Sequence, residues 1–196
     1  EMKRICIVRL SALGDVCLVV PLVRALQRSL PSAQITWVIG KDAFPIVSGI
    51  PDINFVTFNK AAGVAEYLRV GSLLRKQPAF DILLALQASL RANLIYPWIR
   101  AGRKIGFDRR RARDAHGLFV NETIPPARQH FVDAYLSFAV KLGMTPQPAE
   151  WHLPISAEDR SIVQSMIKGC QRPLIAINPA TSRINRNWPL DRYANL

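Results

Sequence analysis

A carboxylate follows the first predicted strand, in the turn Arg9-Leu10-Ser11-Ala12-Leu13-Gly14-Asp15-Val16. The carboxyl ends of the strands in an open parallel sheet line the ligand crevice, so Asp15 is predicted to lie where a substrate binds. The structural alternative is an N-cap that satisfies the free amides of the first helix. The turn lacks G-x-G-x-x-G and Gly-Lys-Ser/Thr, so it is not typical of a dinucleotide site or a P-loop.

A second polar segment, residues 178–189, follows a predicted buried strand and precedes a helix that Pro189 would begin. Its hydroxyl groups, its backbone amides and Arg186 would meet at a helix N-terminus, where phosphate groups bind. An ordinary polar loop is the alternative that the residue types alone leave open.

A basic cluster occupies residues 100–113, where seven cationic side chains stand against one aspartate and supply half of the net charge of +12. Such a density attracts phosphate groups on nucleic acid, anionic lipid or phosphorylated glycolipid. A solvated loop is the alternative, especially for Arg100 and Arg103. Phe107 is the only aromatic residue of the segment, so stacking on single-stranded nucleic acid has little support. The seven are Arg100, Arg103, Lys104, Arg109, Arg110, Arg111 and Arg113.

Short β-branched runs alternate with amphipathic stretches, the pattern of an α/β protein with a mostly parallel sheet. In the first helix, Val16, Val19, Val20, Val23 and Leu26 share one face. Pro21 lies within that run and predicts a kink or a late helix start. Strands are expected near residues 4–9, 34–39, 54–57, 80–84 and 104–107, and helices near 16–29, 42–48, 63–76, 89–100 and 130–142.

Residues 1–150 are predicted to form one domain. Three prolines within residues 145–154 indicate a linker, which a helix (157–168) and a buried strand (173–177) follow. A strand, a loop and less than three turns of helix cannot form a core of their own. Residues 151–196 are therefore expected to be the linker and the start of a second α/β domain that is cut short.

Composition narrows the class of protein. With 49% apolar residues the chain can bury a core, which excludes a disordered polycation and a collagen-like chain. Arg9 and Asp15 interrupt the most hydrophobic stretch, so no run approaches the ~20 residues that span a bilayer. The three cysteines (Cys6, Cys17 and Cys170) are odd in number and lack metal-type spacing. A reducing cytosol is the expected compartment, and zinc is not expected.

Four segments, in their order and spacing, resemble the ADP-heptose:lipopolysaccharide heptosyltransferases, which have the two-domain GT-B glycosyltransferase fold. The resemblance runs over essentially the whole chain and implies a Rossmann-like, acceptor-binding N-terminal half of a GT-B enzyme, followed by the start of its nucleotide-sugar-binding half. The segments are residues 7–16 with Pro21 behind them, residues 80–87 with Ser89 and Arg91, residues 104–108, and residues 178–189 followed by 191–194.

The resemblance gives Asp15 the role of general base, which takes the proton from an acceptor hydroxyl while that oxygen displaces ADP with inversion. Thr181, Ser182 and Arg186 match donor-binding positions, with Arg186 in place of a frequent lysine. The family works without a nucleotide-binding metal of the Asp-x-Asp kind, and ADP-heptose is a donor substrate, so no cofactor is expected.

The acceptor is implied to be the lipopolysaccharide inner core, as Kdo-lipid A or heptosyl-Kdo-lipid A. Gly14, Lys60, Arg91, Arg113 and His130 match acceptor-binding positions. Lys60 lies in a short, variable segment, and His130 could equally be a structural residue at a helix start.

The resemblance implies a cytoplasmic enzyme that docks on the anionic inner membrane, with Arg109 to Arg111 as electrostatic background. The chain of 196 residues alone is expected to bind acceptor without transferring heptose. Two alternatives compete with this interpretation: a basic α/β module that binds nucleic acid, and an N-terminal fragment that neither binds nor reacts.

Overall fold

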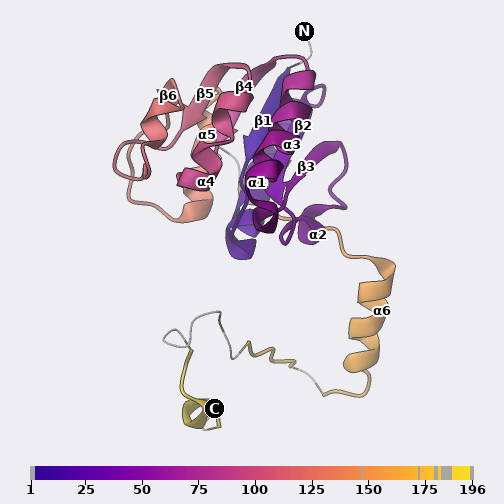
Figure 1. Ribbon diagram of the computed structural model, residues 1–196. Helices are drawn as coiled ribbons and strands as arrows, with labels where there is room; N and C mark the ends of the chain where they lie inside the picture. The colour runs from indigo at the N-terminus through magenta and orange to yellow at the C-terminus, as the bar shows by residue number, and fades with distance from the viewer. Residues whose placement is uncertain (1–2, 147, 172, 179–180, 182–186, 195–196) are drawn as a thin grey trace. The chain divides into compact units, whose positions relative to one another are not determined.

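Six parallel strands form one sheet in the computed structural model, in the order β3-β2-β1-β4-β5-β6 (Figure 1). The structure describes residues 1–196 except 1–2, 147, 172, 179–180, 182–186 and 195–196. It divides the chain into two units, residues 1–154 and 155–196, and the sheet belongs to the first. The predicted α/β class with a Rossmann-like parallel sheet is correct. The strands are β1 (Arg4–Val8), β2 (Gln34–Gly40), β3 (Ile53–Phe58), β4 (Phe80–Ala85), β5 (Ala101–Gly106) and β6 (Glu122–Thr123).

Helices cover both faces of the sheet, because successive side chains of a buried strand point to opposite sides. Ile5 and Ile7 of β1 pack in the apolar cluster that α1 and α5 complete. Cys6 and Val8 pack in the cluster on the other face, which α3 and α4 complete. The helices of this unit are α1 (Leu13–Ser29), α2 (Phe44–Val47), α3 (Gly63–Lys76), α4 (Leu90–Asn93) and α5 (Phe131–Lys141), with 3₁₀ turns η1 (Lys60–Ala62), η2 (Tyr96–Trp98) and η3 (His116–Leu118).

The predicted helix over residues 89–100 is wrong in extent. The structure has only α4, one turn long, and then η2 with Pro97 in its first turn. Pro97 has no N–H and its ring clashes with the preceding turn, so a continuous helix cannot pass through it. Strand β5 begins at Ala101, before the predicted residue 104, because pairing with β4 includes the small residues that lack a strand signal.

Helix α1 begins at Leu13 and continues through Pro21, so the predicted late start is wrong. Pro21 cannot donate to the carbonyl of Cys17, four residues earlier. The indole Nε1 of Trp151 donates to that carbonyl at 3.0 Å. Arg24 in turn donates to the carbonyls of Trp151 (3.4 Å) and His152 (2.6 Å). The segment that ends the first unit thus supplies the hydrogen bond that the proline removes.

Residues 155–196 contain α6 (Ala157–Met166) and α7 (Leu190–Ala194). The predicted strand over residues 173–177 is wrong: Leu174 to Ile177 are irregular, and Ile175 is 83% exposed. A β-strand exists by pairing with a neighbour, and the described part of residues 155–196 offers none. Throughout the described chain, no helix combines the length and apolar character needed to cross a membrane.

Gly40, at the end of β2, is required by a close backbone approach. A Cβ on Gly40 would lie 2.1 Å from the carbonyl oxygen of Leu10, whereas one on Gly102 in β5 would meet its nearest atom at 3.8 Å. We expect Gly40→Ala to lower the free energy of unfolding by about 2 kcal/mol and Gly102→Ala to change it by less than about 0.5 kcal/mol. Urea unfolding followed by tryptophan fluorescence measures both, and equal stability of the two variants would contradict the close approach.

Candidate active site

The strand order 3-2-1-4-5-6 reverses direction between β1 and β4. Chain segments that leave the carboxyl ends of these two strands go to opposite faces of the sheet, and the crevice between them is where open α/β sheets bind ligands. The loop that carries Asp15 follows β1, and the segment that carries Arg91 follows β4. The topology therefore brings two of the predicted site residues to one crevice.

Asp15 lies in the first turn of α1, and its side chain is 34% exposed. Its Oδ2 accepts the backbone N–H of Ala12 at 3.1 Å and lies 2.5 Å from Nη2 of Arg9. Ala12, not Asp15, is the N-cap, so the N-cap alternative is wrong in position although the carboxylate does satisfy a free amide. Among the described residues, both polar contacts given for Asp15 use Oδ2 and neither uses Oδ1.

Arg9 is a site residue to which the sequence analysis gave no role. Its Nη1 donates to the carbonyl of Leu86 at 2.8 Å, and its guanidinium lies 5.8 Å from the centre of the Tyr135 ring. The side chain is only 13% exposed. Arg9 is therefore fixed from three sides and holds the carboxylate of Asp15 in one orientation. A cation directly after the first strand, near a carboxylate, was the signal in the sequence.

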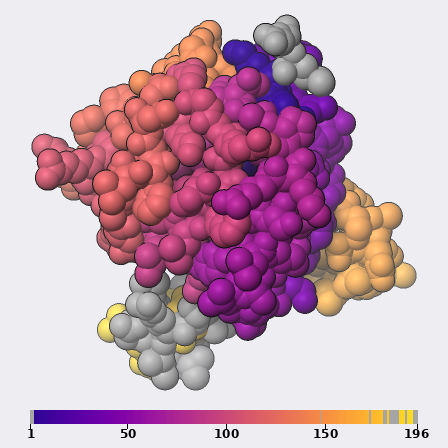
Figure 2. Space-filling view, turned by 45° about the horizontal axis from the view of Figure 1, so that its top comes forward, coloured from indigo at the N-terminus to yellow at the C-terminus, as the bar shows by residue number. Residues whose placement is uncertain are grey.

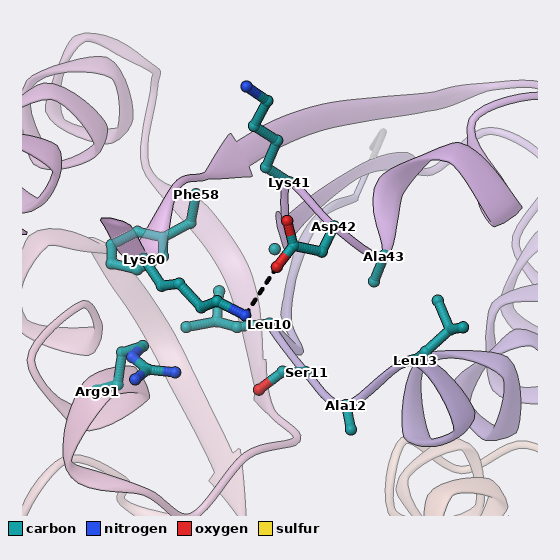
Figure 3. A pocket seen from close by; sticks show the side chains of 11 residues that line it. Leu10, Ser11, Ala12, Leu13, Lys41, Asp42, Ala43, Phe58, Lys60 and Arg91 are labelled. Atoms are coloured by element: carbon teal, nitrogen blue, oxygen red, sulfur yellow. Dashed lines mark ion pairs between the residues drawn. The ribbon is translucent and has the colours of Figure 1, made fainter. Parts of the chain in front are cut away.

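A pocket of about 300 Å³ opens beside this loop. Residues 10–13 form one wall, residues 40–43 another, and Phe58, Lys60 and Arg91 complete the lining. The Lys60 ammonium lies 2.8 Å from Oδ2 of Asp42, which the sequence analysis did not select, and this pairing lowers the pKa of Asp42. Figure 3 shows Lys60, Arg91 and the hydroxyl of Ser11 pointing into the same space, whereas the Lys41 ammonium points away. The pocket can therefore bind an anionic group between two cations.

Three further predicted acceptor residues do not line this pocket. Gly14 lies in the first turn of α1, where an added Cβ would meet nothing within 4 Å. Arg113 is exposed in the loop after β5. His130 is the N-cap of α5, where its Nδ1 accepts the N–H of Val132 at 3.3 Å. The structural role at a helix start, which the sequence left open for His130, is thus present.

Of the predicted donor-binding residues, Ser182 and Arg186 lie outside the described residues. The backbone N–H and the hydroxyl of Thr181 both donate to Oδ1 of Asn187, at 2.7 and 2.9 Å. Asn187, which the sequence analysis did not select, is thus a hydrogen-bond partner of Thr181.

The basic cluster of residues 100–113 is not one patch. Arg100 donates to the carbonyl of Gln77 at 2.8 Å, and Arg103 makes a two-pronged pair with Glu122, at 2.7 and 2.9 Å, that lowers the pKa of Glu122 to about 2. Arg100 directly precedes β5 and Arg103 is its third residue, so they lie about 20 Å and about 10 Å along the strand from its last residue, Gly106, after which the loop begins. In that loop Arg111 pairs with Asp108, whereas Arg109, Arg110 and Arg113 are exposed. Figure 2 shows the surface of this region in pink to salmon.

A buried histidine joins that loop to α4. His116 lies 3.0 Å by its Nδ1 from Oδ1 of Asn93, and its Nε2 accepts the N–H of Phe107 at 3.4 Å. Asn93 also donates to the carbonyl of Asp114 at 2.6 Å, and the Asp114 carboxylate accepts the N–H of Leu90 at 2.8 Å. Both ends of α4 are therefore tied to the residues that follow Arg113.

The model of glycosyltransferase family 9 (heptosyltransferase) matches residues 68–196. The chain belongs to this family. It is 34% identical over 195 residues to the lipopolysaccharide core heptosyltransferase OpsX of Haemophilus influenzae, covering 99% of this chain and 56% of that protein. The chain thus spans little more than half the length of this relative. The resemblance stated from the sequence segments is confirmed at the level of the family.

Solved structures of the family share the fold. The glycosyltransferase family 9 structure from Veillonella parvula superposes with a TM-score of 0.79 at 22% identity, over 100% of this chain and 58% of that one. The Escherichia coli heptosyltransferase WaaC with ADP superposes with a TM-score of 0.72 at 22% identity, over 98% of this chain and 63% of that one. The prediction that this chain has the fold of part of a GT-B heptosyltransferase is therefore correct.

The buried His116 predicts a pH dependence of stability. Burial lowers the pKa of its imidazole from 6.5 to about 4. As the pH falls, the unfolded chain takes up this proton before the folded chain does. The contribution of His116 to the free energy of unfolding therefore has its full value above pH 6.5 and declines between pH 6.5 and about pH 4. Urea midpoints at pH 7.5 and pH 5 should show a smaller decline for His116→Gln than for the wild type. The exposed His152, changed to Gln, serves as control, and an undiminished decline in His116→Gln would refute the assignment.

Proposed function

We propose that this chain is the acceptor-binding part of a heptosyltransferase that transfers heptose from ADP-heptose to the inner core of lipopolysaccharide. The observations that carry the proposal are the Asp15 carboxylate, which Arg9 orients in the first turn of α1, and a pocket with two converging cations that is lined by the loop before this helix, in a chain of the heptosyltransferase family. The names of the Haemophilus relative, a lipopolysaccharide core heptosyltransferase, and of the ADP-bound Escherichia coli structure support the acceptor and donor classes.

In the proposed reaction, Asp15 is the general base. Arg9 and the Ala12 amide occupy Oδ2, so Oδ1 is the oxygen that would take the proton of an acceptor hydroxyl. That hydroxyl oxygen forms a bond to the anomeric carbon of the heptose while the bond from this carbon to the ADP oxygen breaks. ADP leaves with the electron pair, and the anomeric centre is inverted. A carboxylate suffices because the hydroxyl becomes acidic only as its new bond forms.

Lys60 and Arg91 supply the charge for the acceptor. The inner-core sugars and their substituents carry carboxylates and phosphates, which bind guanidinium and ammonium groups by charge-assisted hydrogen bonds. Lys60 is already paired with Asp42, but both side chains are largely exposed, and such pairs contribute little to stability. An acceptor anion can therefore replace Asp42 as the partner of Lys60 at low cost. We propose Gly14, Arg113 and His130 as further acceptor contacts around the same crevice.

The donor diphosphate is proposed to bind at the polar loop before α7. Thr181, Ser182 and Arg186 would offset the negative charge that develops on the leaving ADP, without a metal ion. The hydrogen bonds of Thr181 to Asn187 support this role, because they hold that residue in place before the substrate arrives.

Asp15→Asn tests the general base. The substitution preserves the size of the side chain but removes the proton acceptor, so kcat should fall about 10²- to 10⁴-fold with little change in the KM for acceptor. Heptose transfer by the full-length protein, measured with labelled donor, gives both constants. Asp52→Asn, in an exposed turn away from the crevice, is the matched control. Near-normal turnover of Asp15→Asn would exclude Asp15 as the base.

Arg91→Gln tests the acceptor pocket. Loss of the cation should raise the KM for acceptor about tenfold and leave the KM for ADP-heptose unchanged. Arg109→Gln removes the same charge from the exposed loop after β5 and should leave both constants within about twofold. Equal effects of the two substitutions would show that only net charge matters, as in a basic module that binds any polyanion.

A further inference from the structure

Gln87 connects the two segments that leave the switch point of the sheet. It follows β4 directly after Leu86, and its side chain is buried, with 8% of the residue exposed. Its side-chain oxygen accepts the backbone N–H groups of Leu10 (2.8 Å) and Ser11 (3.2 Å). Its side-chain nitrogen donates to the hydroxyl of Ser89 at 2.9 Å.

The orientation of the Gln87 amide follows from these partners. Two backbone N–H groups can be satisfied only by the oxygen, so the nitrogen must face the Ser89 hydroxyl. The residue is itself anchored, because the hydroxyl of the fully buried Tyr96 donates to the backbone carbonyl of Gln87 at 2.7 Å. We call the Gln87 side chain with these hydrogen bonds the bridge. Its backbone is anchored by Tyr96, and its two ends are the amides of Leu10 and Ser11 on one side and the hydroxyl of Ser89 on the other.

Each end of this bridge leads to a residue of the proposed site. Leu10 and Ser11 belong to the loop that enters α1, whose first turn carries Asp15. Ser89 is the N-cap of α4, which carries Arg91. Since α1 and α4 lie on opposite faces of the sheet, their own packing does not determine how one residue is placed relative to the other.

We propose that Gln87 is a positioning residue for the transfer reaction, one that holds the loop of Asp15 and the helix of Arg91 at a fixed mutual distance through its side-chain amide. The inference rests on the proposed function of these two residues. Gln87 touches neither the pocket nor the reacting atoms, so it acts through the two segments that it joins. An error of about 1 Å between a base and its substrate can lower the rate about 100-fold.

Three variants of the full-length protein test the proposal. Gln87→Leu removes both ends of the bridge, whereas Gln87→Glu restores it, because a carboxylate accepts from Leu10 and Ser11 and the Ser89 hydroxyl can donate in return. Thr36→Val is the matched control: it removes the hydrogen bond, 3.3 Å long, that the side-chain amide of Asn54 donates to the hydroxyl of the buried Thr36, near the amino end of β2.

Two measurements are made on each variant: kcat and KM for heptose transfer, and hydrogen exchange in peptides that cover residues 9–13 and 89–94. Gln87→Leu should lower kcat/KM about 10- to 100-fold and speed exchange in both peptides, whereas Thr36→Val should do neither. Gln87→Glu should recover most of the loss. The proposal is overturned if Gln87→Leu behaves like Thr36→Val, or if folded Gln87→Glu is as impaired as Gln87→Leu.

Ser89→Ala covers the case in which Gln87→Leu does not fold. It cuts only the link to α4, so it should raise the KM for acceptor more than it lowers kcat, and an unchanged KM would count against the bridge. A wild-type protein without transfer activity would refute the proposed function, and the exchange data would then decide alone whether Gln87 holds the two segments.

Discussion

The reversal of strand order between β1 and β4 is the constraint on which the site depends. It sends the two neighbouring segments to opposite faces of the sheet and opens a crevice, so beyond the strand ends their backbone groups need partners outside the ladder between β1 and β4. Gln87 and Gly40 compensate for this from either side. Gln87 accepts the amides of Leu10 and Ser11, and the N–H of Gly40 donates to the carbonyl of Leu10 at 3.1 Å. The loop that carries Asp15 is thereby held between its two neighbours.

The same crevice shows how the positive charge of the chain is used. Several arginines complete the structure: Arg103 pairs with Glu122, Arg100 caps carbonyls at the end of α3, and Arg9 orients a carboxylate. Lys60 and Arg91 instead point into an open pocket. A net charge of +12 by itself indicates affinity for any polyanion, whereas the placement of these two cations favours a small anionic group in this pocket.

Much of the fold could be predicted from the sequence, because buried parallel strands appear as runs of β-branched residues and the helices that cover the sheet appear as amphipathic stretches. Predictions from local sequence patterns failed where strand pairing or tertiary packing determines the structure. The strand expected at residues 173–177 has no partner among the described residues of its unit, and β6 has only two residues. Pro21 predicted a kink or a late start of α1, but the helix begins at Leu13, and Trp151, 134 positions along the chain from Cys17, donates to the Cys17 carbonyl that the proline cannot pair.

The sequence by itself determined the α/β class, the family and the carboxylate at the end of the first strand, since these depend on residue types in a fixed local order. Only the tertiary structure decided which charges belong together. It placed Lys60 and Arg91 in one pocket, divided the basic cluster between β5 with the residue before it and the loop after it, and gave His130 a capping role. The physical reason is that electrostatic and hydrogen-bond partners are chosen by distance in space, and the order of strands in a sheet is not written in any local pattern.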